Sequence, residues 1–91
     1  MILGAITNSF SLKNASDANS ETGNDGMITF CMVRSNVANY PRTNPRGFLI
    51  VSRINSGYIN QAYWDTRTAD VYTRSLASNA TWTDWKLVEA T

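Results

Sequence analysis

The sequence of 91 residues contains no histidine and a single cysteine, Cys31. Without histidine, the chain can hold neither a Ser-His-Asp nor a Cys-His nucleophilic system, and no metal site that uses imidazole. One cysteine forms no internal disulfide and no thiolate zinc cluster, so we expect a fold that is independent of an oxidising compartment. Free cysteine is usually buried, and we expect Cys31 to pack in the core. No cofactor and no bound metal are expected.

Charge of one sign and long hydrophobic runs are also lacking. Eight basic and seven acidic residues give a net charge of +1, and the basic residues are scattered. Nucleic-acid-binding domains usually carry a basic stripe or a pI above about 9, so nucleic acid is not an expected partner. No apolar run approaches the ~20 residues needed to cross a bilayer, so membrane insertion is not expected. The apolar start, Met1–Ile6, is too short and uncharged for a signal peptide, which predicts a chain made in the cytoplasm.

Core-forming and turn-forming residues are both plentiful. Hydrophobic residues make up 43% of the chain and aromatic residues 11%, which is enough for a globular core. Asn, Ser and Thr together make up about a third of the residues, and their side chains favour turns. No window of about 11 or more residues shows a 3.6-residue apolar period. The sequence therefore predicts a mainly β fold: a small antiparallel sheet or sandwich-like domain with little helix.

Alternating patterns and turn residues locate the elements of this fold. The expected strands are Met27–Arg34, Phe48–Ile54, Tyr58–Trp64 and Val71–Leu76. The last three should form an antiparallel meander, with turns at residues 55–57 and 65–70. Residues 2–12 are either a strand or a lead-in, and residues 82–90 predict a closing turn and short strand that seals one side of the meander.

Side chains along the strand Tyr58–Trp64 should alternate between the two faces of the sheet. Tyr58, Asn60, Ala62 and Trp64 are expected on one face. The other face should receive Ile59, Gln61 and Tyr63.

Paired carboxylates are the catalytic arrangement that this composition still allows, because histidine-based and cysteine-based sites are excluded. Asp65 and Asp70 lie at the two ends of one turn and could reach the roughly 5–10 Å separation of glycosidase carboxylates. Asp84 lies near the terminal tryptophans. The simpler interpretation is that these acids cap turns and stay solvated, so we expect no catalytic activity.

The polar loop before Met27 holds a second group of oxygen-bearing side chains, namely Asp17, Glu21, Asn24 and Asp25. Their spacing lacks the Asp-x-Asp-x-Asp-Gly pattern of an EF-hand, so we interpret them as solvated loop residues rather than a calcium site. No glycine pattern of the Walker or Rossmann type is present, which leaves nothing to cradle a phosphate.

Aromatic residues are the remaining functional signal. Aromatic rings beside amide and guanidinium groups can stack on sugar rings and bind their hydroxyls. The candidate ligand-binding residues are Tyr58, Asn60, Trp64, Trp82 and Trp85. For Trp82 and Trp85 a packing role is favoured, and Arg74 facing an aromatic ring would make a structural cation–π contact.

Four segments of the second half follow one another in a fixed order: Gly47-Phe-Leu-Ile-Val51, Gln61-Ala-Tyr63, Val71-Tyr-Thr-Arg74 and Trp82-Thr-Asp-Trp85-Lys-Leu87. In this order and spacing they resemble the knob domain of pyocin and contractile-phage tail fibres, over about residues 24–89. The resemblance divides the chain into a lead-in segment, residues 1–22, and a knob-like β domain, residues 23–91. It implies a framework of Gly47, Gln61, Tyr72, Arg74 and Leu87.

The resemblance also implies a setting: a homotrimeric tail fibre, tailspike or tailocin that acts at the bacterial surface as part of a virion. Our first hypothesis is a module for host attachment that binds cell-surface polysaccharide. The alternative is a purely structural domain, which stabilises the trimer or assists assembly with the other fibre domains. A small carbohydrate-active enzyme built on Asp65 and Asp70 is a third, weaker hypothesis.

Overall fold

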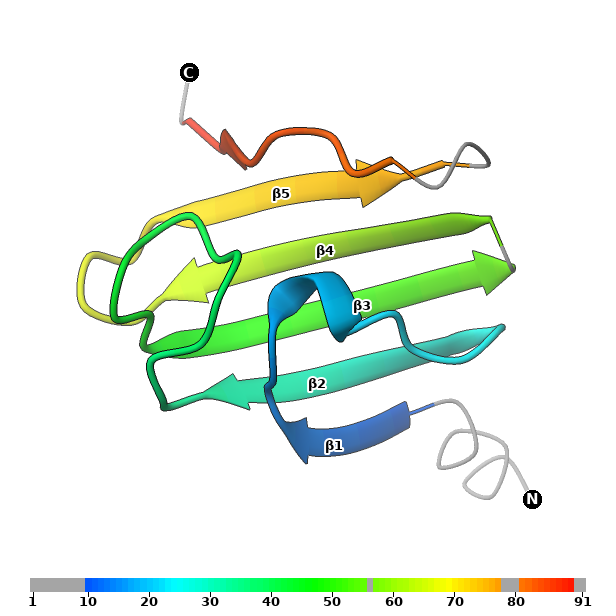
Figure 1. The fold of residues 1–91 in the computed structure, drawn as a ribbon, viewed down its shortest axis with the longest axis horizontal. Coiled ribbons are helices and arrows are strands. Elements are labelled where there is room, and N and C mark those ends of the chain that lie inside the picture. Colours follow the sequence, from blue (N-terminus) through cyan, green and yellow to red (C-terminus); the bar gives the residue numbers. More distant parts are fainter. Residues whose placement is uncertain (1–9, 56, 78–80, 90–91) are drawn as a thin grey trace.

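The computed structural model describes residues 10–55, 57–77 and 81–89, which form one six-stranded sheet and a single turn of 3-10 helix (Figure 1). Each strand pairs with its neighbour in sequence, in the order β1-β2-β3-β4-β5-β6. The elements are β1 (Phe10–Asn14), η1 (Ala18–Ser20), β2 (Met27–Val33), β3 (Gly47–Asn55), β4 (Tyr58–Asp65), β5 (Val71–Leu76) and β6 (Lys86–Leu87). The predicted mainly β class is confirmed, and so is the antiparallel meander of β3, β4 and β5. No helix in the described ranges is long and apolar enough to span a membrane.

The strand β1 pairs with β2 in parallel, which makes the sheet mixed rather than purely antiparallel. Parallel neighbours need a crossover connection of about a dozen residues. Here residues 15–26 cross one face of the sheet and carry η1 on the way (Figure 1). Residues 10–22, expected as a lead-in, therefore contribute an edge strand and part of the cover of this sheet. The expected division at residue 22 into two units stays a prediction, and residues 1–9 lie outside the described part.

The core lies on one face only. Strand register and burial bring six buried hydrophobic residues together on this face: Cys31, Val33, Leu49, Val51, Ile59 and Tyr63. Cys31 is 1% exposed, as the sequence predicted, and burial raises the pKa of its thiol to about 11. The cover consists of two loops, residues 15–26 and 34–46, and of the terminal segment around Trp82 and Trp85 (Figure 1). We call this side of the sheet the covered face.

Three contacts fix the loop of residues 34–46 on the covered face. The ring of Tyr40 meets the ring of buried Tyr63 edge-on, with centroids 5.5 Å apart. The Tyr40 hydroxyl donates to the Ser16 carbonyl at 2.8 Å, which ties this loop to the preceding one. The Tyr63 hydroxyl accepts from the Arg46 N–H at 3.0 Å, where the loop returns to β3. The cover is therefore held by hydrogen bonds as well as by apolar packing.

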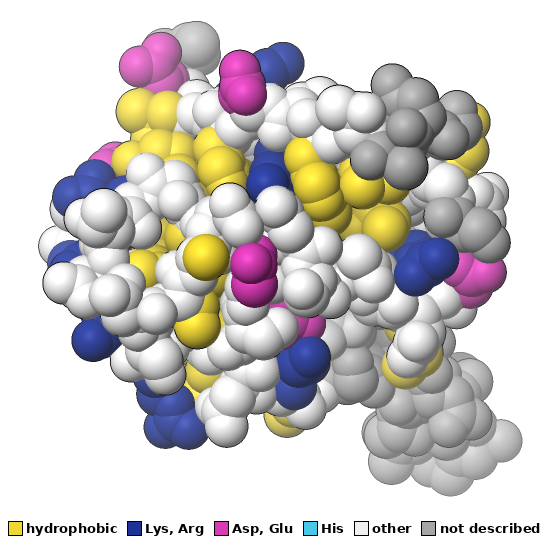
Figure 2. Space-filling model, in the orientation of Figure 1, with side chains coloured by type: hydrophobic (Ala, Val, Ile, Leu, Met, Phe, Trp, Pro, Cys, Tyr) yellow, Lys and Arg dark blue, Asp and Glu magenta, His cyan; other side chains and the backbone are white. Residues whose placement is uncertain are grey.

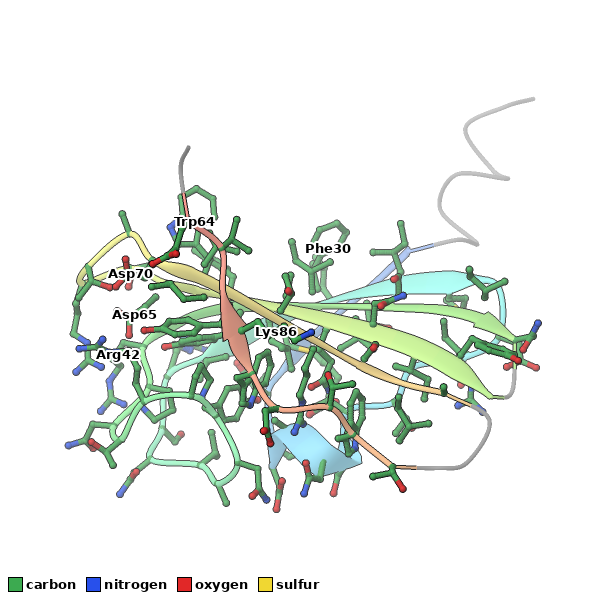
Figure 3. The ribbon with its side chains drawn as sticks, turned by 90° about the horizontal axis from the view of Figure 1, so that it is seen from above. Phe30, Arg42, Trp64, Asp65, Asp70 and Lys86 are labelled. Carbon is green, nitrogen blue, oxygen red and sulfur yellow. The ribbon has the colours of Figure 1, made fainter. Side chains whose placement is uncertain are left out.

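The opposite side of the sheet carries no second layer among the described residues. Figure 3 views the sheet along its edge and shows Phe30 and Trp64 projecting from one side, whereas Arg42 lies on the other. Of the two arrangements expected from the sequence, the single sheet is the one observed. We call the uncovered side the open face.

Candidate functional surface

The five candidate ligand-binding residues do not form one site. Within β4, Tyr58, Asn60 and Trp64 alternate with the buried residues and point to the open face. Trp82 and Trp85 instead pack on the covered face, against the core. The predicted alternation of β4 is confirmed, but the sheet separates Trp64 from the other two tryptophans.

Trp82 and Trp85 enclose the guanidinium of Arg74. The guanidinium carbon lies 4.1 Å from the centroid of the Trp82 ring and 4.5 Å from that of Trp85. The Trp85 indole N–H donates to the Asn39 carbonyl at 2.9 Å. Cation–π contacts of this kind are worth roughly 0.5–2 kcal/mol each. Both rings thus have the packing role that the sequence favoured, and the structural cation–π contact of Arg74 is present.

Arg74 also belongs to a buried polar network with Gln61, which is 1% exposed. The Gln61 amide nitrogen donates to the carbonyls of Ala18 at 2.7 Å and Glu21 at 2.8 Å. Its amide oxygen accepts from Arg74 Nε at 2.8 Å. Arg74 Nη2 donates to the Asn19 side-chain oxygen at 2.9 Å. The network joins η1 and its flanking residues to β4 and β5.

The other expected framework residues differ in how strongly the fold constrains them. Gly47 begins β3 where a Cβ atom would lie 1.8 Å from the Trp64 carbonyl oxygen, so any side chain would push β3 away from β4. Tyr72 is half-buried, 6.4 Å from the Tyr63 ring between centroids. Leu87 pairs with Tyr72 through β6 but is itself exposed. Gly47 therefore has a strict steric role that Leu87 lacks.

Asp65 is a buried anchor of the turn between β4 and β5. Its carboxylate lies 3.1 Å from Arg42 Nε and 3.4 Å from Arg67 Nη2, and it accepts from the Arg67 N–H at 2.8 Å. Burial alone would raise the pKa of this carboxyl, but the hydrogen bonds and charge of Arg67 lower it below its ordinary value. The prediction that Asp65 caps its turn is confirmed; the prediction that it is solvated is wrong, because its side chain is 0% exposed.

The turn brings the backbones of Asp65 and Asp70 together. The Asp65 N–H donates to the Asp70 carbonyl at 2.9 Å. A glycosidase needs one of its two carboxyls protonated through a raised pKa. The pKa of Asp65 moves in the opposite direction, and two guanidinium groups occupy the space around its carboxylate. The arrangement suits turn stabilisation.

Glu21 is the second buried carboxylate. It pairs with Lys13 at 2.8 Å and accepts from the N–H of Ser16 at 2.6 Å and from its hydroxyl at 2.7 Å. Burial would raise the pKa of Glu21, but the hydrogen bonds from Lys13 and Ser16 hold it below its ordinary value. The prediction that Glu21 is a solvated loop acid is therefore wrong. Glu21 is buried and anchors the crossover loop to β1.

The other acids of the polar loop have separate partners. Asp17 accepts from the Asn19 N–H and the Asn39 side-chain amide, both at 2.8 Å. Asp25 pairs with Arg53 at 2.9 Å. Within the described ranges, no three His, Cys, Asp or Glu side chains gather as a metal site would require.

The open face is the most distinctive surface of the molecule. Its apolar members come from β1 to β5 and are Leu12, Ile28, Phe30, Met32, Phe48, Ile50, Ile54, Ala62, Trp64 and Val71. The register arranges eight of them in two rows across the sheet. One row runs Leu12, Phe30, Ile50, Ala62, and the other Met32, Phe48, Trp64, Val71.

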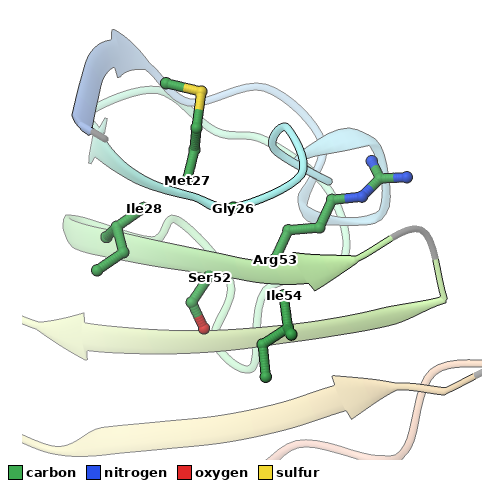
Figure 4. A pocket seen from close by; sticks show the side chains of 6 residues that line it. All are labelled: Gly26, Met27, Ile28, Ser52, Arg53 and Ile54. Carbon is green, nitrogen blue, oxygen red and sulfur yellow. The ribbon is translucent and has the colours of Figure 1, made fainter. Parts of the chain in front are cut away.

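Many of these side chains are exposed although they are large. Phe48 is 45% exposed, Trp64 51% and Met32 43%. A hollow of about 280 Å³ lies among Leu12, Phe30, Met32 and Phe48. Beside it, a hollow of about 380 Å³ is lined by residues 26–28 and 52–54, where Ile28 and Ile54 flank Ser52 (Figure 4). Both are shallow depressions in a broad apolar surface rather than deep ligand cavities.

The covered face presents a different exterior. Figure 2 shows it as mostly polar, with basic and acidic side chains of both signs scattered between small apolar areas. In strands β1–β5 the charged side chains alternate onto this side: Lys13, Arg53, Asp65 and Arg74. The two faces of one sheet therefore differ sharply in charge.

Sequence reasoning found Trp64 but missed the surface around it. The signal was present in β2 and β3, where Met27–Val33 and Phe48–Val51 are almost continuously apolar. Strands that are buried on both faces have such runs, whereas a strand with one solvated face alternates with polar residues. The continuous apolar runs of β2 and β3 therefore indicate that both faces of these strands are apolar, in addition to indicating strands.

Comparison with known proteins identifies one family. The family model of the XkdV N-terminal domain, a phage-associated family, matches residues 4–88. No curated protein and no solved structure matches the chain significantly. Because the match covers nearly the whole sequence, the chain belongs to the XkdV N-terminal domain family. The expected phage association is thereby confirmed.

Replacing Arg74 by lysine should destabilise the fold. Lysine lacks the planar fork that binds Gln61 and Asn19 while stacking on two indole rings, so the buried Gln61 oxygen would lose its donor. We expect Arg74→Lys to lower the free energy of unfolding by about 2 kcal/mol, measured by urea denaturation. Arg34→Lys, the same change at an exposed residue, is the control and should cost less than about 0.5 kcal/mol. Equal losses in both variants would refute the role of the network.

The two buried carboxylates should make stability depend on acid pH. Glu21 and Asp65 have folded-state pKa values below the ordinary ones of roughly 4.3 and 3.9. Their contribution is therefore complete above about pH 5 and is lost as the pH falls through the lowered values. Glu21→Gln and Asp65→Asn should each flatten the decline of unfolding free energy below pH 5. Glu89→Gln makes the same change of charge at an exposed carboxylate, and a decline as flat in this control would contradict the assignment.

Proposed function

We propose that this chain, as a member of the XkdV N-terminal domain family, is a non-catalytic structural module of a phage tail fibre or tailspike. It acts in the virion, or in a tailocin particle, where the fibre meets the host cell surface. Its partners are further copies of itself, as in a homotrimer, and the other domains of the fibre. The family match over residues 4–88 is the observation that carries this proposal.

The chemistry of the described residues supports a structural role. The two buried carboxylates, Glu21 and Asp65, are both bound to cationic side chains and serve as anchors of loops. Two further buried polar side chains, Gln61 and Arg74, bind each other and the loops that cover the core. A domain whose buried polar groups are all engaged in this way supplies shape and rigidity rather than reactive groups.

The knob-domain resemblance of the second half supports the placement in a fibre. Gly47, Gln61 and Arg74, which the resemblance assigns to the framework, have structural roles in this fold. A framework that preserves the fold is what a structural module of a fibre requires.

The test is the presence of the folded chain in particles. Purified particles of the phage that encodes it should contain the protein, detected by mass spectrometry and located on the tail by immunogold labelling. Leu49→Asp places a carboxylate in the core and should remove the protein from particles. Leu87→Asp, the same change at an exposed position away from the open face, is the matched control and should be incorporated normally. A chain that is abundant in the lysate but absent from wild-type particles would refute the proposal.

Glycan binding is the second candidate, and Trp64 is the observation that favours it. Its ring is 51% exposed on the open face, in the strand that also carries Asn60. Thr73 on β5 pairs with Ala62, so its hydroxyl is a diagonal neighbour of Trp64, and the Asn60 amide lies further along β4 on the same face. An exposed ring beside such groups can stack on a sugar. Trp82 and Trp85 are not proposed as glycan-binding residues, because both rings pack on Arg74 and on the core.

Tryptophan fluorescence separates the two candidates. The structural proposal predicts no saturable change when host lipopolysaccharide or its free polysaccharide is added, up to sugar concentrations of about 1 mM, the weak end of the affinity range. Saturable quenching that Trp64→Ala abolishes and Leu87→Ala, at an exposed position away from the open face, retains would establish glycan binding at the open face instead.

A further inference from the structure

The open face has the composition of a buried surface. In β2 and β3 the residues on this side are apolar almost throughout, although the other side of the same strands already forms the core. An antiparallel sheet with one solvated face normally turns polar residues to the water. Sheets and helices form stable domains in packed layers, and here the second layer is missing from the described chain. Another apolar surface is needed to form the second layer on the open face.

The face is large enough to be an interface. Five strands spaced about 4.8 Å apart, with about six residues each at ~3.3 Å, give a flat area of about 500 Å². Protruding side chains increase the accessible area beyond that value, toward the ~800 Å² that each partner contributes to a standard interface. The largest apolar patch on a typical monomer is about 300–600 Å², so a face of this size is comparable with the largest patches that monomers carry.

Its charge distribution restricts the occupant. Among the described residues of β1–β5, no charged side chain points to the open face, and Lys86 of β6 lies at its far edge. An acidic or basic partner would find no opposite charge there. An uncharged apolar partner surface can cover the open face without burying an unpaired charge. Burying such a charge would cost several kcal/mol.

We propose that the open face is the surface through which copies of this chain pack against one another. A second copy presents the same two apolar rows on a sheet of the same width and the same hand of twist. Sheets pack through such faces about 10 Å apart, and the copies can do so as a pair or as three sheets that turn their open faces to a common axis. The rows centred on Phe30 and Phe48 of each copy then form a common core. This inference rests on the proposed function for the self-association that it localises.

The test measures the mass of the isolated chain by light scattering after gel filtration and by sedimentation equilibrium. Between about 1 and 200 µM, the range of weak to moderate interfaces, the wild type should have the mass of two or three chains. Phe48→Glu and Trp64→Glu should each shift it to one chain, because a carboxylate would be buried without a partner. Leu87→Glu makes the same change at an exposed position away from the open face and should keep the wild-type mass.

Circular dichroism checks that each variant retains its sheet. Should Phe48→Glu fail to fold, Met32→Lys on the same row provides an independent disruption. A wild type that is monomeric up to about 200 µM, or variants that keep the assembled mass, would overturn the inference. A chain that is monomeric alone yet present in particles overturns only this inference. A chain that assembles through the open face but is absent from particles overturns only the proposed function.

Discussion

The contact between Gln61 and Arg74 is the constraint on which the rest of the structure depends. Both side chains are buried, and a buried polar group without a partner costs about 1–3 kcal/mol. Gln61 meets this requirement by binding two carbonyls of the crossover loop, and Arg74 by binding Gln61 and Asn19 between two indole rings. One pair in the middle of the sheet therefore fixes both the N-terminal crossover and the C-terminal turn.

The same constraint explains why the molecule has two unlike faces. Loops can cover a sheet only if their backbone groups find partners, and the network provides these on the side of Gln61. Glu21 and Asp65 extend it toward the two ends of the sheet by holding the crossover loop to Lys13 and the β4–β5 turn to Arg42. All of this polar cover lies on one face, so the apolar side chains of the other face remain exposed.

The acids show how a local pattern can mislead. In the sequence, Glu21 and Asp65 stand among turn residues, where carboxylates are usually solvated. Each is buried beside a basic residue of another segment: Arg42 reaches Asp65 from the loop that precedes β3, and Lys13 of β1 reaches Glu21. The tryptophans show the converse. Trp64 and Trp82 looked like members of one aromatic set, but the sheet lies between them.

Local patterns in the chain were enough to predict the strands from Met27 onward, the meander of β3 to β5, the alternation within β4 and the burial of Cys31. These features depend on a period of two and on turn residues, which are local properties of the chain. Contacts between distant segments set the parallel pairing of β1, the packing of Trp82 and Trp85 on Arg74, and which face of the sheet is covered. Those outcomes depend on pairs such as Arg74 with Asn19, 55 residues apart, and on loops whose path no local pattern specifies.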